Sequence, residues 1–213
     1  MPLLEQRLSV GARAADQVRD PRLLADALRR FRDRYPAIDL SVEEGGSRDL
    51  VRSLSRGQLD LALVIVPLND DAHDLETTPI LRESLVLASR ADAGPDPLPE
   101  TMPVADLRGH PLVMFREGYD LREVTMTACR AAGFEPTLSV EGGEMNAVLR
   151  FVEAGLGVAV VPSMVLASRP ELRGTRLERP ALERTIALAH RRADILPQAA
   201  VAFKHDLLTD LAS

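Results

Sequence analysis

The chain contains the same short pattern twice, 98 residues apart, and this repeat restricts the folds that the sequence can adopt. Residues 40–46 read LSVEEGG and residues 138–143 read LSVEGG. Each segment alternates apolar and polar residues, as a strand does, and stops at a glycine pair. A helical pattern follows each pair up to Gly57 or Gly155, and a second apolar run comes next. The repeated strand–helix–strand unit predicts two similar α/β lobes with a small-molecule cleft between them.

Length and composition are those of an ordinary globular protein. The 213 residues are 46% hydrophobic and 27% charged, enough for one large domain or two lobes. No apolar run reaches the roughly 18 residues of a membrane span, and the N-terminus lacks the pattern of a secretory signal. We therefore expect a cytoplasmic protein with no membrane partner. Cys129 is the only cysteine, so no internal disulfide is expected, and its place on an apolar helix side predicts a core position.

Charge argues against DNA binding by this chain alone. The formal net charge is −6, whereas phosphate contacts need a concentrated basic surface. The arginines are spread along helices among acids, and the cluster at residues 29–34 (RRFRDR) is typical of a solvated helix face. Aromatic residues make up only 3% of the chain, which leaves no stacking platform for single strands.

The order of expected elements predicts an α/β fold. Residues 8–11, 38–43 and 59–66 read as strands, and helices between them open at Asp20 and Pro21 and at Ser47. This alternation favours a doubly wound parallel sheet. Further elements are expected in the segments 85–89, 105–109, 111–115, 121–132, 184–190 and from Pro197 onward. The predicted first lobe is 1–88 with 169–213, and the predicted second lobe is 89–168.

Signatures of enzymes are missing from the sequence. The chain has no G-x-S-x-G, C-x-x-C or H-E-x-x-H pattern, and its four histidines are scattered. The glycines of residues 155–157 leave a helix and enter a strand, which is the reverse of the dinucleotide-binding order. The acids Glu43, Glu44, Glu141 and Glu144 fit exposed loop rims better than a catalytic pair. We expect no catalytic residue, no metal and no cofactor.

At this point the sequence resembles a known family. The runs 31–36 (FRDRYP), 57–63 (GQLDLAL) and 152–162 (VEAGLGVAVVP) are similar to the effector-binding half of LysR-type transcriptional regulators. The resemblance extends over essentially the whole chain, in order. It implies two Rossmann-like lobes of the type 2 periplasmic-binding-protein kind and a small-molecule effector in the cleft. It also implies a homodimer, with DNA bound only through an N-terminal winged helix-turn-helix that is absent from this chain.

The site is expected beyond the carboxyl ends of the strands, where helix N-termini point their N–H groups into the crevice. Arg13 and Arg116 are candidates to pair with an anionic effector, and the Ser47 hydroxyl to serve both as helix cap and ligand contact. The glycine pairs are expected to adopt positive φ or to let backbone approach the ligand. The full predicted effector-binding set is Arg13, Ala14, Asp16, Ser47, Val66, Pro67, Phe115, Arg116, Glu117 and Gly143.

One departure from the family pattern leaves the charge of the effector open. The family usually carries a serine or threonine a few residues after the first strand, whereas residues 13–17 here read RAADQ. Asp16 would repel a carboxylate and favour a cationic or polyhydroxyl group. Two alternatives from other classes remain, a cytoplasmic solute-binding protein and an enzyme on the same two-lobed scaffold.

Overall fold

The chain forms two compact units. The computed structural model describes residues 7–12, 23–68, 73–92, 97–192 and 196–211. Unit 1 comprises Met1–Arg82 and Thr185–Ser213, and unit 2 comprises Glu83–Arg184. The sequence-based boundary at 88/89 differs from this because a long strand, β4 (Leu75–Arg90), continues across the first crossing. The boundary at 168/169 differs because a strand at residues 172–178 belongs to unit 2, and the chain crosses back within β10 (Glu183–Arg191).

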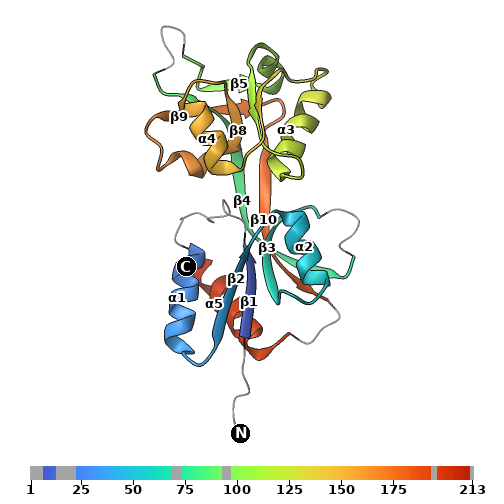
Figure 1. Cartoon of the computed structure of the whole chain (residues 1–213). Helices are drawn as coiled ribbons and strands as arrows, with labels where there is room; N and C mark the ends of the chain where they lie inside the picture. The colour runs from blue at the N-terminus through green and yellow to red at the C-terminus, as the bar shows by residue number, and fades with distance from the viewer. Residues whose placement is uncertain (1–6, 13–22, 69–72, 93–96, 193–195, 212–213) are drawn as a thin grey trace. The chain divides into compact units, whose positions relative to one another are not determined.

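Unit 1 is a mixed sheet covered by helices (Figure 1). Its strands β1 (Arg7–Ala12), β2 (Asp39–Glu44) and β3 (Leu61–Val66) are parallel, with β1 in the middle. The expected parallel order therefore holds for these three strands, but β10 adds to β3 in the antiparallel direction. The helices of this unit are α1 (Leu23–Arg34), α2 (Ser47–Ser55) and α5 (Gln198–Leu211).

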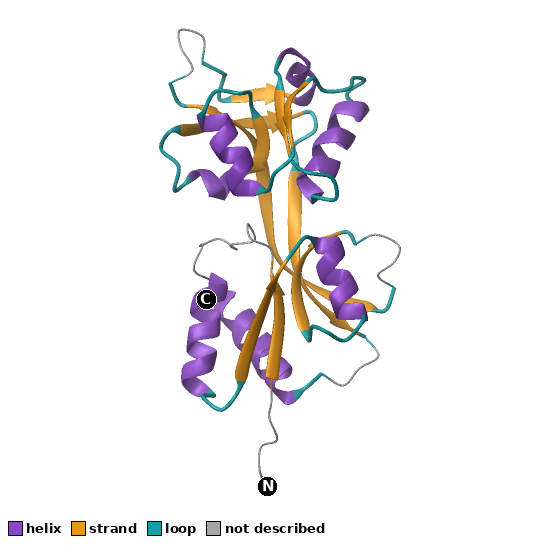
Figure 2. Cartoon of the chain, in the orientation of Figure 1, coloured by secondary structure: helices purple, strands orange, loops and turns teal. Residues whose placement is uncertain are grey.

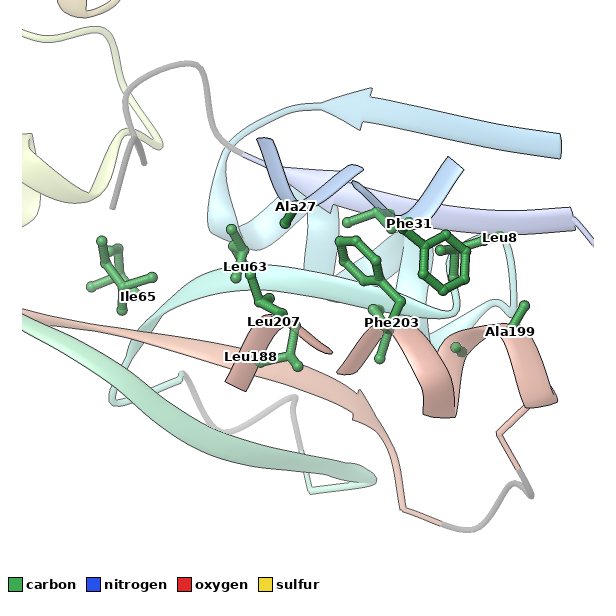
Figure 3. Close-up of a cluster of buried hydrophobic side chains, with 13 residues drawn as sticks. Leu8, Ala27, Phe31, Leu63, Ile65, Leu188, Ala199, Phe203 and Leu207 are labelled. Atoms are coloured by element: carbon green, nitrogen blue, oxygen red, sulfur yellow. The ribbon is translucent and has the colours of Figure 1, made fainter. Parts of the chain in front are cut away.

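Alternate residues of β3 supply the cores on the two faces of this sheet. Leu61, Leu63 and Ile65 pack with α1 and α5 on one face, where Phe31 meets Phe203 edge-on at 5.3 Å between ring centroids (Figure 3). Ala62 and Val64 face α2 and its buried leucines on the other. A strand covered on both faces must be apolar throughout, which explains the continuous run in the sequence. None of the described helices combines the length and apolar composition that a membrane crossing requires.

Unit 2 is also built of strands and covering helices, shown in Figure 2. A parallel pair, β6 and β7, is continued by a single parallel bridge to Val158, just before β8. Strand β4 pairs antiparallel with both β8 and β9, and β9 pairs parallel with β5. The bounds are β5 (Thr101–Pro103), β6 (Leu112–Met114), β7 (Leu138–Glu141), β8 (Ala159–Pro162), β9 (Leu172–Glu178), α3 (Asp120–Ala131), α4 (Met145–Glu153), η2 (Val104–Gly109) and η3 (Ser163–Leu166).

The repeat seen in the sequence is a structural repeat. The element series β2–α2–β3 in unit 1 corresponds to β7–α4–β8 in unit 2. In both units the first strand of the series pairs parallel with a central strand, β1 or β6. Both helices are followed by a glycine with positive φ, Gly57 at 72° and Gly155 at 78°. The closing glycines are thus conformationally required, because L side chains are strained in this region.

Two strands of unit 2 lie outside the sequence-based expectation. Strand β9 and the short strand β5 were not anticipated, and β4 begins ten residues before the expected start at Leu85. Exposed residues interrupt the first half of β4, so its pattern lacks the continuous apolar signal of a central strand. Such strands are specified by their neighbours rather than by their own periodicity.

Candidate functional site

In unit 1 the carboxyl ends of three parallel strands meet at one sheet edge. The N–H of Gly45 donates to the carbonyl oxygen of Ala12 at 3.1 Å, which joins the end of β2 to the end of β1. The third strand ends at Val66, whose peptide bond to Pro67 is cis. The structure therefore brings Ser47, Val66 and Pro67 of the predicted set to the same edge. The other predicted residues of this unit, Arg13, Ala14 and Asp16, lie outside the described residues, as does the expected cap at Asp20.

The role of Ser47 as a helix cap is wrong. Gly46 occupies the N-cap position, with φ −73° and ψ 158°, and Ser47 is the first residue of α2. The Ser47 side chain is buried, and its hydroxyl oxygen accepts a hydrogen bond from the Ile65 N–H at 3.1 Å. This hydroxyl therefore ties α2 to β3, and its proposed contact with an effector stays a prediction.

The two glycine pairs differ in conformation. Gly142 and Gly143 have φ values of 116° and 90°, which confirms the expected positive φ for this pair. Gly46 has a negative φ, so for this residue only the other expectation, approach of the backbone to a ligand, stays a prediction. A Cβ at Gly45 would meet other atoms only at ordinary contact distances, 3.6 Å or more. The sequence repeat thus marks a similar chain path but not the same backbone conformation.

In unit 2 the ends of β6 and β7 are joined in the same way. The Gly142 N–H donates to the Met114 carbonyl at 3.0 Å, and the Arg116 N–H donates to the Gly143 carbonyl at 3.0 Å. Arg116, Glu117 and Gly143 of the predicted set therefore lie together at this edge. Helix α4 starts directly after them, with Glu144 at its N-cap.

The Phe115 ring packs against a second aromatic ring. The side chain is buried, and it stacks on Tyr119 with 4.7 Å between the ring centroids and 6° between the planes. The expected contact of Phe115 with an effector stays a prediction. Tyr119, which sequence reasoning missed, is the N-cap residue of α3 and follows a turn at residues 117–118. Because the two rings meet across a loop, no helical or strand periodicity in the sequence points to the pair.

A second arginine at this edge was also missed. The Arg122 guanidinium donates to the Phe115 carbonyl at 3.0 Å and to Glu141 Oε1 at 3.3 Å. Its side chain is mostly buried, so Arg122 supports the loop after β6 rather than a ligand. The acids Glu43, Glu44, Glu141 and Glu144 are exposed, as expected, but the first three end strands rather than lie in loops. Glu43 accepts from Ser53, and Glu144 pairs with Arg116. Within the described ranges, no three side chains of His, Cys, Asp or Glu are placed to hold a metal ion.

Taken unit by unit, the fold defines a class of ligand-binding protein, with two α/β units of the periplasmic-binding-protein kind. The LysR substrate binding domain model matches residues 4–212. The chain belongs to this family.

Known relatives agree with this assignment. The chain is 29% identical over 168 residues to the transcriptional dual regulator GltC of Bacillus subtilis, covering 78% of this chain and 55% of that protein. It is 33% identical over 178 residues to a probable hydrogen peroxide-inducible genes activator of Streptomyces viridosporus, covering 80% and 55%. The regulatory domain of Synechocystis CcmR, solved with 2-PG, superposes with a TM-score of 0.84 at 21% identity, covering 97% of this chain and 98% of that one. The chain thus spans about half the length of the curated relatives it matches.

Proposed function

We propose that this chain is the effector-sensing part of a bacterial LysR-type transcriptional regulator. It would bind a small molecule at the strand ends and pass the binding state to a DNA-binding domain on the same polypeptide. The observation that carries the proposal is the convergence of strand ends in each unit. The Gly45–Ala12 bond brings two ends together in unit 1, and the Arg116–Gly143 bond does so in unit 2. In open α/β sheets this edge is where ligands bind.

The mechanism would be a population shift. An effector that binds one conformation of the domain more tightly raises the population of that conformation by its differential affinity. The DNA-binding domains of the assembly would then be spaced differently on their operator. With a net charge of −6 the chain is itself a poor ligand for DNA, so DNA contact falls to the other domain. A regulator that acts on DNA in a bacterium works in the cytoplasm, and its role is regulatory rather than catalytic.

A thermal-shift screen of small metabolites tests this proposal. A ligand that binds only the native state raises the melting temperature, and calorimetry then gives its affinity. For unit 1 we expect Gly45→Val to weaken binding roughly tenfold by adding bulk at the edge, while Gly109→Val, whose Cβ meets nothing within 4 Å, leaves affinity unchanged. For unit 2 we expect Arg116→Ala to alter the affinity for the effector. Arg130→Ala, which removes an exposed side chain near the end of α3, should leave this affinity unchanged. Effectors that bind all four variants equally would contradict the site.

Turnover separates this proposal from the two other classes. A metabolite that is bound and recovered unchanged argues against an enzyme on the same scaffold. A DNA-binding domain in the parent reading frame argues against a solute-binding protein. The interlobe cleft expected from the sequence stays a prediction.

We further propose that the chain forms a homodimer, although not through the apolar stripe of α1. That stripe is used inside unit 1, where Leu24, Leu28 and Phe31 pack against the core. Support for the dimer comes instead from β2, which ends the sheet order and exposes 52% of Val42. An edge strand with an exposed apolar side chain is suited to pairing with a second copy.

Light scattering tests this second proposal. We expect a mass of twice 23.3 kDa for the wild type and a shift toward one chain mass for Val42→Lys. The control is Val201→Lys on α5, because Val201 is equally exposed but lies on a helix. A monomeric wild type at high protein concentration would contradict the dimer.

A further inference from the structure

Arg116 is the one predicted anion-binding residue that the structure describes, and its guanidinium is already occupied. Its Nε donates to Glu144 Oε1 at 2.9 Å, and its second terminal nitrogen, Nη2, lies 2.9 Å from the same oxygen. The remaining nitrogen, Nη1, donates to the Glu117 carbonyl at 3.3 Å. A carboxylate of the same chain therefore lies where a carboxylate, sulfate or phosphate group of a ligand would lie.

The pair has little structural purpose of its own. The side chains are 40% and 52% exposed, and ion pairs this exposed contribute little to stability. Glu144 is the N-cap residue of α4, yet its side chain makes no cap hydrogen bond, so its departure would leave the helix as it is. The backbone of Arg116 is held separately by its N–H bond to Gly143.

Arg122 shows what a structural arginine looks like at the same edge. Its side chain is only 15% exposed and bonds the Phe115 carbonyl, seven residues away, as well as a carboxylate. Arg116 also bonds one carbonyl and one carboxylate, but its side chain is 40% exposed and the carbonyl is that of the next residue, Glu117. The contrast between the two arginines indicates that the Arg116 pair can open without disturbing the loop.

We propose that Glu144 masks an oxyanion site at Arg116. An effector with a carboxylate, sulfate or phosphate group would displace the Glu144 carboxylate and take its two hydrogen bonds from Arg116. This inference rests on the proposed function and names the chemical class of the effector. The displaced Glu144 would turn to solvent, and no covalent step is involved.

Masking has a consequence for selectivity. A carboxylate held on the same chain competes at a high effective concentration. The apparent affinity of any oxyanion therefore equals its intrinsic affinity multiplied by the fraction of time that the site is open. Small inorganic ions would then be excluded. An effector must make further contacts at the strand ends to win the competition, so Glu144 sets a threshold against common cellular anions.

The test uses inorganic sulfate as the probe, at constant ionic strength and neutral pH, on the chain as it stands. The readout is the NMR signal of the Arg116 Nε–H group during titration. We expect Glu144→Gln and Glu144→Ala to bind sulfate at least roughly tenfold more tightly than the wild type. The matched control is Glu123→Gln, which removes the same charge from an exposed acid in the first turn of α3, seven residues from Arg116 and outside the candidate site. Its sulfate affinity should stay close to that of the wild type.

Two outcomes would overturn the proposal. The first is equal sulfate affinity in the Glu144 and Glu123 variants, which would show that the gain comes only from the change in net charge. The second is a gain that survives Arg116→Gln in the Glu144→Gln background. Failure here is distinguishable from failure of the proposed function. An effector that binds equally to wild type, Glu144→Gln and Arg116→Gln would contradict masking but not sensing, and a metabolite screen without any effector would contradict sensing but not the sulfate result.

Discussion

The hydroxyl oxygen of Ser47 accepts a hydrogen bond from the backbone N–H of Ile65 at 3.1 Å, and so joins the start of α2 to the end of β3. The donor is a buried main-chain group next to the strand end, where the sheet no longer supplies a partner for every peptide. Buried N–H groups without an acceptor are costly. This bond turns a residue that the sequence suggested as a ligand contact into a support for the edge.

Ser47→Ala should therefore lower stability. We expect a loss of about 1–3 kcal/mol in the free energy of unfolding, because the Ile65 N–H is left buried without this acceptor. Urea denaturation measures the loss. Ser55→Ala, at the exposed end of the same helix, is the control and should change stability by less than about 0.5 kcal/mol. Equal stability of the two variants would show that water replaces the hydroxyl.

The buried ion pair of Glu83 and Arg184 offers a second prediction. The side chains are 5% and 1% exposed, and the two residues are the first and last of unit 2. Removal of one partner leaves a buried charge, so Arg184→Met should cost about 3–5 kcal/mol. The double variant Glu83→Leu with Arg184→Met should recover most of this loss. Urea denaturation measures the free energy of unfolding of each variant. As a control, breaking the exposed pair of Arg130 and Glu135 should change the urea midpoint little. If the losses of the two single variants simply add in the double variant, the two side chains are not coupled.

The reactivity of Cys129 is the third prediction. Burial raises the pKa of its thiol to about 11, so at pH 8 only about one molecule in a thousand carries a thiolate. We expect Cys129 to resist thiol reagents and peroxide until denaturant is added. Mass spectrometry after treatment checks this. Rapid modification of the native protein would contradict the burial of this thiol.

Gly143 is the residue for a backbone prediction. Its φ is 90°, and a Cβ there would lie 2.9 Å from the Ala147 Cβ. Gly143→Ala should therefore destabilise the protein by about 1–2 kcal/mol or more. Gly109→Ala is the matched control, since Gly109 has open space around it, and it should be neutral or slightly stabilising. Thermal unfolding of the two variants distinguishes strain from a general effect of removing glycine.

The free energy of unfolding at acid pH should depend on Glu153. The hydrogen bond from Arg169 holds the pKa of this carboxyl below its usual 4.5. A lowered pKa contributes stability that is present above the unfolded-state pKa and is lost as pH falls through the folded-state pKa. The stability gap between wild type and Glu153→Gln should therefore be constant near neutral pH and shrink below about pH 4.5. Urea denaturation across this range measures it, with Glu117→Gln as the control; a gap that widens on acidification would reverse the sign.

The repeated framework could be predicted from local patterns in the sequence. Alternating residues before each glycine pair, a helical stretch, and a closing glycine at Gly57 or Gly155 are local signals, and the structure confirms them with positive φ at both glycines. The continuous apolar run of β3 likewise predicted a strand covered on both faces. These features follow from short-range sterics and periodicity, which a sequence carries directly.

The roles of the edge residues, in contrast, depend on contacts between distant parts of the chain. Ser47 and Ile65 are 18 residues apart, and Arg116 and Glu144 are 28 apart, so no local pattern shows that either pair meets. Strand β9 also emerges only from its pairing with β4 and β5. Polar side chains near strand ends choose among several partners by distance and burial, and the fold alone sets both. For this reason the sequence located the candidate edges, while the packing assigned Ser47 to support and placed Glu144 on Arg116.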